Sequence, residues 1–385
     1  MTNLLRNRKF REATLQAVVV AVVAAAIIAM VVNTRASLEA QGMTSGFSFL
    51  GWTTGWDFSF SVLPYSISDT YTRTLIIGLL NTLLLGVVSI FFATIIGVLI
   101  GLIRTSSNYL FALLGTIYVE IFRNVPVILQ AVFWYAIMSH LPRPRSAINM
   151  GDSVFLSGRG VYFPVMNIAL TAVFIAALLL ILWLIILLAF RYRLQMAGTY
   201  RIFRNIGWLL VVIAMIAILV KGRIPETTLW NIPALKGLNF RGGMRMPPEL
   251  TALIIAISLY GGAYIGEVVR AGLMSVPRGQ IEAGMMTGLK PRHIFTRIRL
   301  PLAIRNVLPS LTNQYVQLIK ATTIGLAVGF SDYFMIVSTS INQSGQTLEL
   351  IALLMCGFLL INLSIAFIMN TLNRRMALKG YEVKA

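Results

Sequence analysis

Six polar or ionisable side chains lie close together in an apolar stretch near the C-terminal end of the chain. They are Asn313, Gln314, Gln317, Lys320, Thr322 and Thr323. Polar groups inside a long apolar segment are costly, so they are candidates for a solute pathway. Gln314, Gln317 and Lys320 recur at three-residue spacing, which predicts that they share one helix face. Lys320 could attract a carboxylate there, or its amine could extend to the edge of the apolar zone, or pair with another subunit's acid, and meet no solute.

The other titratable groups offer less chemistry. Glu267 and Arg270 are three residues apart, so they can form an ion pair along a helix or take part in a gate. His140 and His293 have no nearby carboxylate pair, which argues against metal binding and against catalysis. Cys356 is the only cysteine, so the chain can form no internal disulfide. The sequence therefore predicts no catalytic residue and no metal site, and the chain is not expected to be an enzyme.

The composition of the 385 residues indicates whether the chain folds in water or in a lipid bilayer. Apolar residues make up 57% of the chain and charged residues only 12%, whereas about 25% of residues are charged in a soluble domain. The formal net charge of +19 could suggest nucleic acid, but the basic residues stand between apolar runs and form no single patch. The chain is therefore expected to lie in a lipid bilayer.

Long apolar runs predict the elements that position these side chains. A bilayer core of about 30 Å needs about 20 apolar helical residues. Runs of this kind, bounded by charge, Gly or Pro, predict about eight membrane-spanning helices. Their approximate bounds are 15–32, 75–103, 125–139, 168–190, 206–220, 250–269, 307–330 and 350–372. The predicted fold class is an all-α polytopic membrane protein.

The Lys and Arg residues between the spans predict the orientation. If the N-terminus is cytoplasmic, the inner segments carry more of these residues than the outer ones, and the C-terminus is cytoplasmic too. The first apolar run could instead belong to a cleaved signal peptide, but it is long for one, and Thr34-Arg35-Ala36 is a poor cleavage site. Residues 33–69 and 221–249, rich in Gly, Trp, Thr and Pro, are expected to form periplasmic loops.

An amphipathic segment follows the sixth predicted span. Between residues 280 and 305, charged and apolar residues alternate in a way that favours a location on the bilayer face or against another protein. Gly288 divides the segment into two short helices, because glycine accepts the positive φ of a sharp turn. Pro291 suits the first turn of the second helix, and Pro301 ends it.

Seven positions of this segment fit the spacing of the EAA motif, in which Glu-Ala-Ala precedes a Gly and then Ile-x-Leu-Pro. They are Glu282, Ala283, Gly284, Gly288, Ile298, Leu300 and Pro301. The chain here resembles the permease subunits of binding-protein-dependent ABC importers, whose two short helices dock into a cleft of a cytoplasmic ATPase. Gly284 departs from the usual Ala, a change that costs a helix up to about 1 kcal/mol.

Residues outside the motif indicate which group of permeases the chain resembles. Asn81-Thr82, Tyr264 and the stretch from Ser275 to Gln280 look like polar-amino-acid permeases, and 118–126 is similar to permeases of the general L-amino-acid transporter. Ala321, after Lys320, departs from the acid or amide common in those permeases. The resemblance implies a five-helix type I ABC importer permease core plus extra helices. The domains it implies are an anchor helix with a periplasmic loop (1–70), a permease domain (71–372) with a two-helix insertion (165–249) and a coupling loop (272–305), and a cytoplasmic tail (373–385).

The same resemblance implies partners. Such a permease works as a dimer, often with a distinct second permease, on two ATPase subunits that bind ATP and Mg, and a periplasmic amino-acid-binding protein delivers the substrate. The chain has no Walker A sequence, so ATP would be hydrolysed on the partner and the chain itself needs no cofactor. The expected function is import of polar or general L-amino acids by alternating access. The alternative is an ion-gradient-driven secondary carrier, but no internal repeat supports it.

Overall fold

The computed structural model describes residues 8–40, 46–169, 200–224 and 228–376, together with 171–187 except 174, 177, 181, 184 and 185. The chain forms two compact units. The helical unit combines Met1–Trp134 with Ala252–Ala385, and the inserted unit is Tyr135–Thr251. The predicted tail beyond residue 376 lies outside the described residues.

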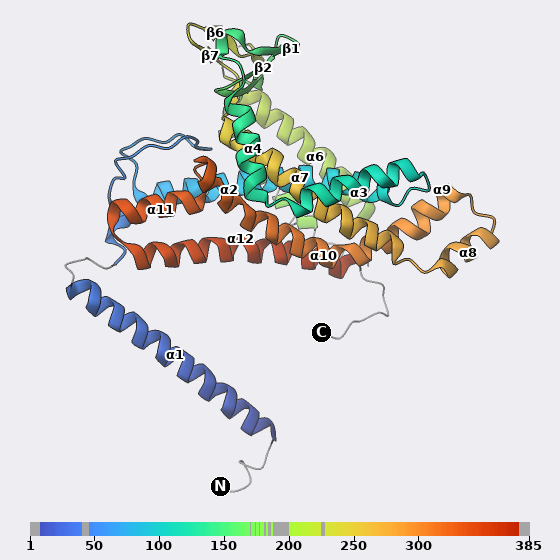
Figure 1. Cartoon of the computed structure of the whole chain (residues 1–385), viewed down its shortest axis with the longest axis horizontal. Coiled ribbons are helices and arrows are strands. Elements are labelled where there is room, and N and C mark those ends of the chain that lie inside the picture. The colour runs from blue at the N-terminus through green and yellow to red at the C-terminus, as the bar shows by residue number, and fades with distance from the viewer. Residues whose placement is uncertain are drawn as a thin grey trace. The chain divides into compact units, whose positions relative to one another are not determined.

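Helices, most of them long, make up most of the helical unit (Figure 1). Their bounds are α1 (Arg8–Ala40), α2 (Tyr71–Arg104), α3 (Tyr109–Asn124), α4 (Val127–Ser139), α7 (Pro248–Met274), α8 (Arg278–Met286), α9 (Pro291–Ile294), α10 (Leu300–Ala321), α11 (Tyr333–Ser344) and α12 (Thr347–Met376). Helix α10 packs against α12 and α2, while α11 packs against α2 and α12. The polar face predicted in the seventh span thus lies on a helix held by two others.

Five of the described helices are long and apolar enough to cross a membrane, or up to seven if each of two bent pairs is one span. The prediction of about eight spans agrees approximately with this number. Helix α3 was not predicted, and it forms with α4 a pair bent by 99°. A second bent pair joins residues 291–328 to α11 at 51°, so the chain bends where the seventh predicted span, 307–330, ends. The fourth predicted span, 168–190, is described only in part, because nine of its residues lie outside the described ones.

Each bend has a local cause. Pro126 follows α3 and cannot continue its hydrogen bonding, and the Gln130 amide donates to the freed carbonyls of Phe122 (3.0 Å) and Val125 (2.9 Å). After α10, a 3₁₀ turn, η4 (Thr322–Val328), ends at Gly329 with φ of +76°. Non-helical backbone at membrane depth persists only where protein groups satisfy it, so both breaks are specified features of the fold.

Small residues let α2 and α7 approach closely. Gly97 and Gly101 on α2 lie against Gly266 on α7, and Gly262 on α7 lies against Ile96 of α2. The two glycines of each helix have the Gly-x-x-x-Gly spacing that permits tight contact between membrane helices. A Cβ added at Gly97 would lie 2.5 Å from Cγ2 of Ile265 and 3.0 Å from the Gly266 nitrogen. This helix pair carries the charged residues of α7 described below.

The close packing predicts that Gly97→Ala lowers the free energy of unfolding by about 1–3 kcal/mol, since one helix must shift to admit the methyl group. The matched control is Gly279→Ala on α8, where an added Cβ has no neighbour within 4 Å. That change should be neutral or stabilise the chain by up to about 1 kcal/mol. Thermal unfolding of both purified variants is the measurement, and equal midpoints would contradict the packing argument.

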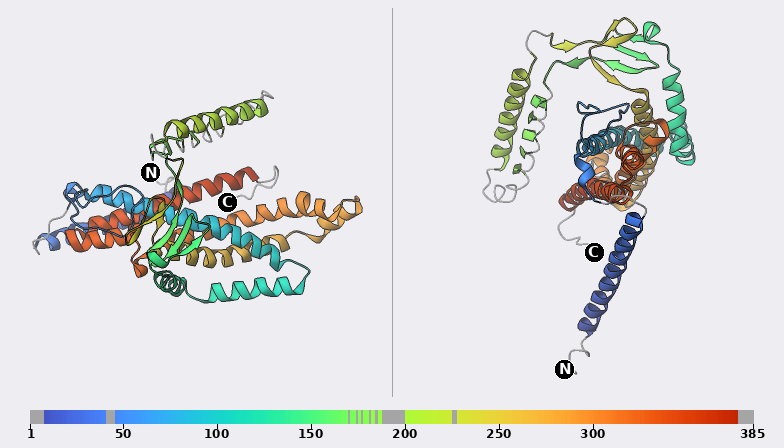
Figure 2. Two further views of the ribbon diagram at one scale, coloured as in Figure 1. Left: turned by 90° about the horizontal axis from the view of Figure 1, so that it is seen from above. Right: turned by 90° about the vertical axis from the view of Figure 1, so that its left-hand side faces the viewer.

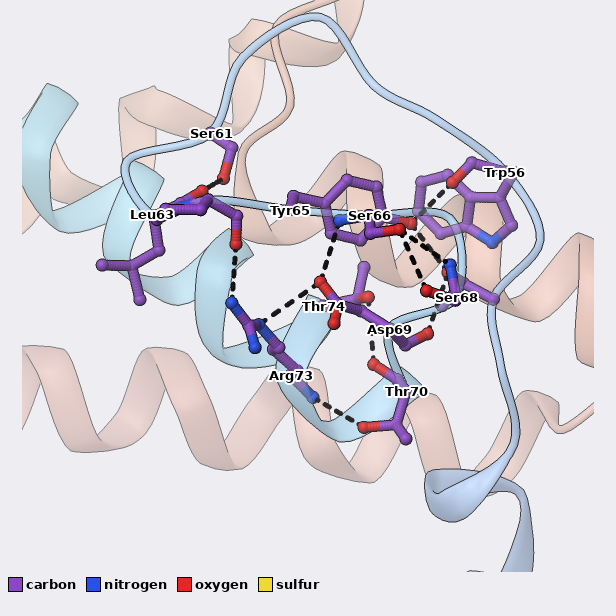
Figure 3. A network of polar contacts seen from close by, with 12 residues as sticks. Trp56, Ser61, Leu63, Tyr65, Ser66, Ser68, Asp69, Thr70, Arg73 and Thr74 are labelled. Carbon is purple, nitrogen blue, oxygen red and sulfur yellow. Dashed lines mark hydrogen bonds and ion pairs between the residues drawn. The ribbon is translucent and has the colours of Figure 1, made fainter.

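The loop before α2 is folded by its own polar contacts (Figure 3). The Tyr65 hydroxyl donates to the Trp56 carbonyl at 2.6 Å. Arg73 donates to the Pro64 carbonyl at 2.7 Å, and its Nε lies 3.3 Å from Asp69 Oδ2. The side chain of Thr70 caps α2 by accepting the Arg73 N–H. The loop is held against the helices by an apolar cluster whose buried members are Phe49, Tyr71, Leu75, Tyr333, Ile336, Val337 and Leu350.

The inserted unit contains α6 (Tyr200–Lys221), together with short strands that the sequence does not predict (Figure 2). An antiparallel sheet has the order β1-β2-β3-β8, formed by Ile148–Met150, Val154–Ser157, Gly160–Phe163 and Met244–Met246. Two further pairs join β4 (Val165–Met166) to β5 (Trp230–Asn231) and β6 (Ala234–Lys236) to β7 (Asn239–Arg241). Phe240 packs its ring against Phe155 (4.5 Å between centroids) and Tyr162 (4.9 Å), which gives the sheet a small aromatic core.

Candidate functional site

The EAA-like residues form a helical hairpin that lies beyond the N-terminal end of α10 (Figure 1). Helix α8 ends at a turn in which Gly288 has φ of +75°. The N–H of Leu289 donates to the Gly284 carbonyl at 3.2 Å, and the N–H of Gly288 to that of Met285 at 2.9 Å. These two bonds form a Schellman motif, which requires a left-handed residue at the glycine position. We call α8, this turn, α9 and the π-helical turn η3 (Phe295–Arg299) the coupling hairpin.

Gly284 has a packing role that the sequence did not indicate. It is buried, and an added Cβ would lie 2.8 Å from Cδ1 of Ile298 and 3.3 Å from Cγ1 of Ile294. The two arms of the hairpin therefore meet at a residue with no side chain. In this chain the glycine permits a closer contact between the arms than alanine would allow.

The hairpin is attached to two membrane helices at once. Ile281 and Phe295, one from each arm, pack against a buried cluster of Leu273, Val276 and Ala303. This cluster joins the C-terminal end of α7 to the N-terminal turns of α10. The Arg299 guanidinium also donates to the Leu273 carbonyl at 3.2 Å. A displacement of the hairpin must therefore move both α7 and α10.

The outer surface of the hairpin combines charge with exposed methionine. Glu282 and Ala283 are exposed, and the side chains of Met285 and Met286 are 56% and 88% exposed. Gly288 is exposed as well, whereas Ile298, Leu300 and Pro301 are half-buried and support the inner side. Flexible methionines around a charge suit a protein-binding surface.

The polar residues of α10 and η4 separate into two sets. Asn313, Gln317 and Lys320 are exposed, and Gln314 is half-buried. Thr322 is fully buried, and its hydroxyl donates to the Ile319 carbonyl at 2.7 Å. The hydroxyl of Thr323 donates to the Lys320 carbonyl at 2.8 Å. In the part of the chain that the structure describes, no carboxylate lies within 4.0 Å of Lys320. Lys320 can thus accept an anionic partner from outside the chain.

Glu267 has a second cationic partner that sequence reasoning missed. Arg270 Nη2 lies 2.5 Å from Glu267 Oε1 along α7, and Arg104 at the end of α2 pairs with Oε2. The carboxylate therefore links two helices, and one positive charge remains in excess. A signal was present, because Arg104 ends the second predicted span on the same predicted side of the bilayer as Glu267.

We expect Arg104→Ala to destabilise the helical unit more than Arg270→Ala. The Arg104 side chain is 11% exposed and that of Arg270 29% exposed, so solvent replaces the lost partner less well at Arg104. Losing the hydrogen bonds to a charged group there should cost about 1–3 kcal/mol. Thermal unfolding of the two variants in one detergent tests this order, and a larger loss for Arg270→Ala would contradict it.

The break between η4 and α11 contains a buried acid that was not singled out. Asp332 is 0% exposed, and its Oδ1 accepts the Met335 N–H at 2.9 Å as the cap of α11. Two residues of α2 hold the same break, since Asn81 donates to the Ser331 carbonyl at 2.7 Å and Thr82 accepts the Tyr333 N–H at 2.9 Å. The Asn81-Thr82 pair, noted in the sequence as a resemblance, thus has a structural role.

Comparison with known proteins gives consistent matches. Residues 199–378 match the family described as "Binding-protein-dependent transport system inner membrane component". The chain is 40% identical over 351 residues to the putative amino-acid ABC transporter permease protein YhdX of Escherichia coli (strain K12), covering 90% of this chain and 89% of that protein.

Two further relatives are similar over most of their length. The general L-amino acid transport system permease protein AapQ of Rhizobium johnstonii is 37% identical, with 90% of this chain and 87% of the relative covered. The glutamate/glutamine/aspartate/asparagine transport system permease protein BztB of Rhodobacter capsulatus is 32% identical, with 98% and 96% covered.

Proposed function

Because the chain belongs to the family of binding-protein-dependent transport system inner membrane components, we propose that it forms the transmembrane pore through which an ATP-driven importer moves L-amino acids into the cytoplasm. The names of the three relatives support amino acids as the substrate class. The exposed Lys320, which faces no carboxylate of the described chain, fits the α-carboxylate that all amino acids share. None of the names of these three relatives points to a secondary carrier.

The coupling hairpin is the observation that carries the mechanism. Its outer surface, with Glu282 and the two exposed methionines, docks on the ATPase subunit, and its inner side is packed on α7 and α10. ATP binding, with Mg on the ATPase dimer, closes the dimer and displaces the hairpin. The two attached helices then move together, which is the rigid-body type of transition that packed elements favour. Access to the Lys320 face alternates between the two sides of the membrane.

This arrangement supports the assembly and the orientation that we propose. Docking on a cytoplasmic ATPase requires the hairpin to be cytoplasmic, and the excess of Lys and Arg in the segments on that side supports cytoplasmic termini. A second permease, related to this chain and distinct from it, completes the pore. The permease domain extends over 71–372, with the helices of 165–249 and the coupling loop of 272–305 as parts of it. A periplasmic binding protein delivers the substrate to the opposite side.

The test is reconstitution of the affinity-purified complex in liposomes. We expect the tagged chain to carry an ABC ATPase and a second permease through purification in mild detergent, identified by mass spectrometry. Uptake of labelled amino acids should then require ATP inside the liposomes and the binding protein outside. Uptake that follows an ion gradient without ATP, or purification without an ATPase, would refute the proposal.

A further inference from the structure

The inserted unit carries an arginine-lined hollow that the proposed transport cycle does not use. We call it the basic hollow and define it by Arg143, Arg145 and Arg159, which line it together with Ser146, Gly158 and Leu238. Its volume is about 600 Å³. All three arginines are exposed, so the hollow opens to solvent. It lies wholly within the inserted unit, on a segment that the proposed orientation places outside the cytoplasmic membrane.

Backbone contacts fix the main chain at Arg143 and Arg145. Arg143 and Arg145 flank Pro144, which is buried at the start of a short 3₁₀ turn. The Gly158 N–H donates to the Pro142 carbonyl at 2.9 Å, and an added Cβ at Gly158 would lie 2.8 Å from the Leu141 carbonyl oxygen. Turns of this kind fix the backbone from which the charged side chains extend, which reduces the backbone entropy lost on binding.

Arg159 is fixed in a similar way by its neighbours in the sheet. Its N–H donates to Ser157 Oγ at 3.3 Å, and its carbonyl accepts from the Arg245 Nε at 2.9 Å. Both contacts use the backbone of Arg159 and leave its guanidinium available. Arg245 therefore acts on the hollow by positioning Arg159.

The positive charge of the hollow is not balanced within the described chain. No carboxylate of the described residues lies within 4.0 Å of any of the three guanidinium groups. Their one side-chain hydrogen bond in that part of the chain joins Arg145 Nε to the Gly237 carbonyl at 3.5 Å. Asp152, the acid between Arg145 and Arg159 in the sequence, is bonded to Asn149 instead. Arginine forks match carboxylates with two parallel bonds, so the hollow is suited to an acidic partner.

We propose that the basic hollow docks an acidic surface segment of the periplasmic binding protein. The inference rests on the proposed function, which supplies that partner. The open shape argues against a free amino acid as occupant, since sites for small ligands enclose most of the ligand surface. Several carboxylates on one protein segment can pair with three arginines at once and remain partly solvated. Such complementary charge speeds encounter and fixes orientation.

The experiment uses the complete transporter in nanodiscs of phosphatidylcholine, a zwitterionic lipid. ATPase activity is titrated with the substrate-loaded binding protein at two ionic strengths. In the triple variant Arg143→Glu, Arg145→Glu, Arg159→Glu, the half-maximal concentration of binding protein should rise about tenfold or more at low salt. The difference should shrink at high salt, because exposed charges are screened. If the triple variant fails to fold, Arg159→Gln should still show a smaller shift in the same direction.

A matched pair separates the hollow from overall charge. Arg159→Glu and Arg241→Glu change the net charge equally, but Arg241 is exposed on β7 and does not line the hollow. We expect a clearly larger shift for Arg159→Glu. Equal shifts would overturn the docking proposal, and so would a shift that appears only when anionic lipid is added, which would identify a lipid headgroup as the occupant. A wild-type complex that the binding protein does not stimulate would instead refute the proposed function itself.

Discussion

Replacing Gly288 with proline is expected to abolish ATP-coupled transport while the membrane helices remain folded. The residue has φ of +75°, and its N–H donates to the Met285 carbonyl. Proline is fixed near −65° and has no N–H, so it cannot form the turn that ends α8. A conformational cost of roughly 3 kcal/mol corresponds to about a hundredfold loss of hairpins competent to dock. The turn is exposed, so the loss should be confined to the hairpin.

The measurement is ATP-driven uptake together with recovery of the ATPase on the tagged chain. Gly288→Asn is the matched control, because asparagine tolerates the left-handed conformation better than other residues with side chains. We expect this variant to keep the ATPase and to transport within about threefold of the wild type. Normal uptake by the proline variant would show that the hairpin geometry is not needed for coupling.

The coupling hairpin shows why part of the site could be predicted from the sequence. Gly288 and Pro291 are local signals, since the backbone conformation that they allow does not depend on distant contacts. The prediction that Pro301 ends the second helix was wrong, because the helical backbone continues from α9 through η3 into α10 and Pro301 lies in the first turn of α10, where a missing N–H is tolerated. The presence of two short helices and the turn between them therefore followed from a single segment. Long apolar runs predicted the spanning helices for the same reason, because bilayer thickness sets their length.

Other parts of the site depend on contacts between distant segments. The sequence placed Glu267 with Arg270 but could not show that Arg104 on α2 completes the group. Gly284 looked like a weakened helix position, and only its contact with Ile298 explains the glycine. The short strands of the inserted unit were missed because their two to four residues are too few for a clear alternating pattern. Their pairing joins segments such as β3 and β8, which are far apart in the sequence.

The polar face of α10 could be predicted in outline but not residue by residue. Spacing placed Gln314, Gln317 and Lys320 on one face, whereas the structure also exposes Asn313 and buries Thr322. The burial of Thr322 arises where the α-helix tightens into η4, a change that no local pattern announced. Lys320 is the one cation among these residues, and it stands directly before that change. A binding role for this face therefore depends chiefly on Lys320.

We expect Lys320→Met to raise the KM for the transported amino acid about tenfold or more. A hydrogen bond to a charged group contributes about 1.5–3 kcal/mol, and about 1.4 kcal/mol corresponds to a factor of ten. Lys320→Arg keeps the charge and should retain much of the affinity.

The decisive comparison uses the amide of the same amino acid, which lacks the carboxylate. If Lys320 binds that carboxylate, the wild type prefers the acid over the amide and Lys320→Met loses the preference, which a double-mutant cycle measures as coupling. If the preference survives in Lys320→Met, Lys320 does not contact the substrate carboxylate.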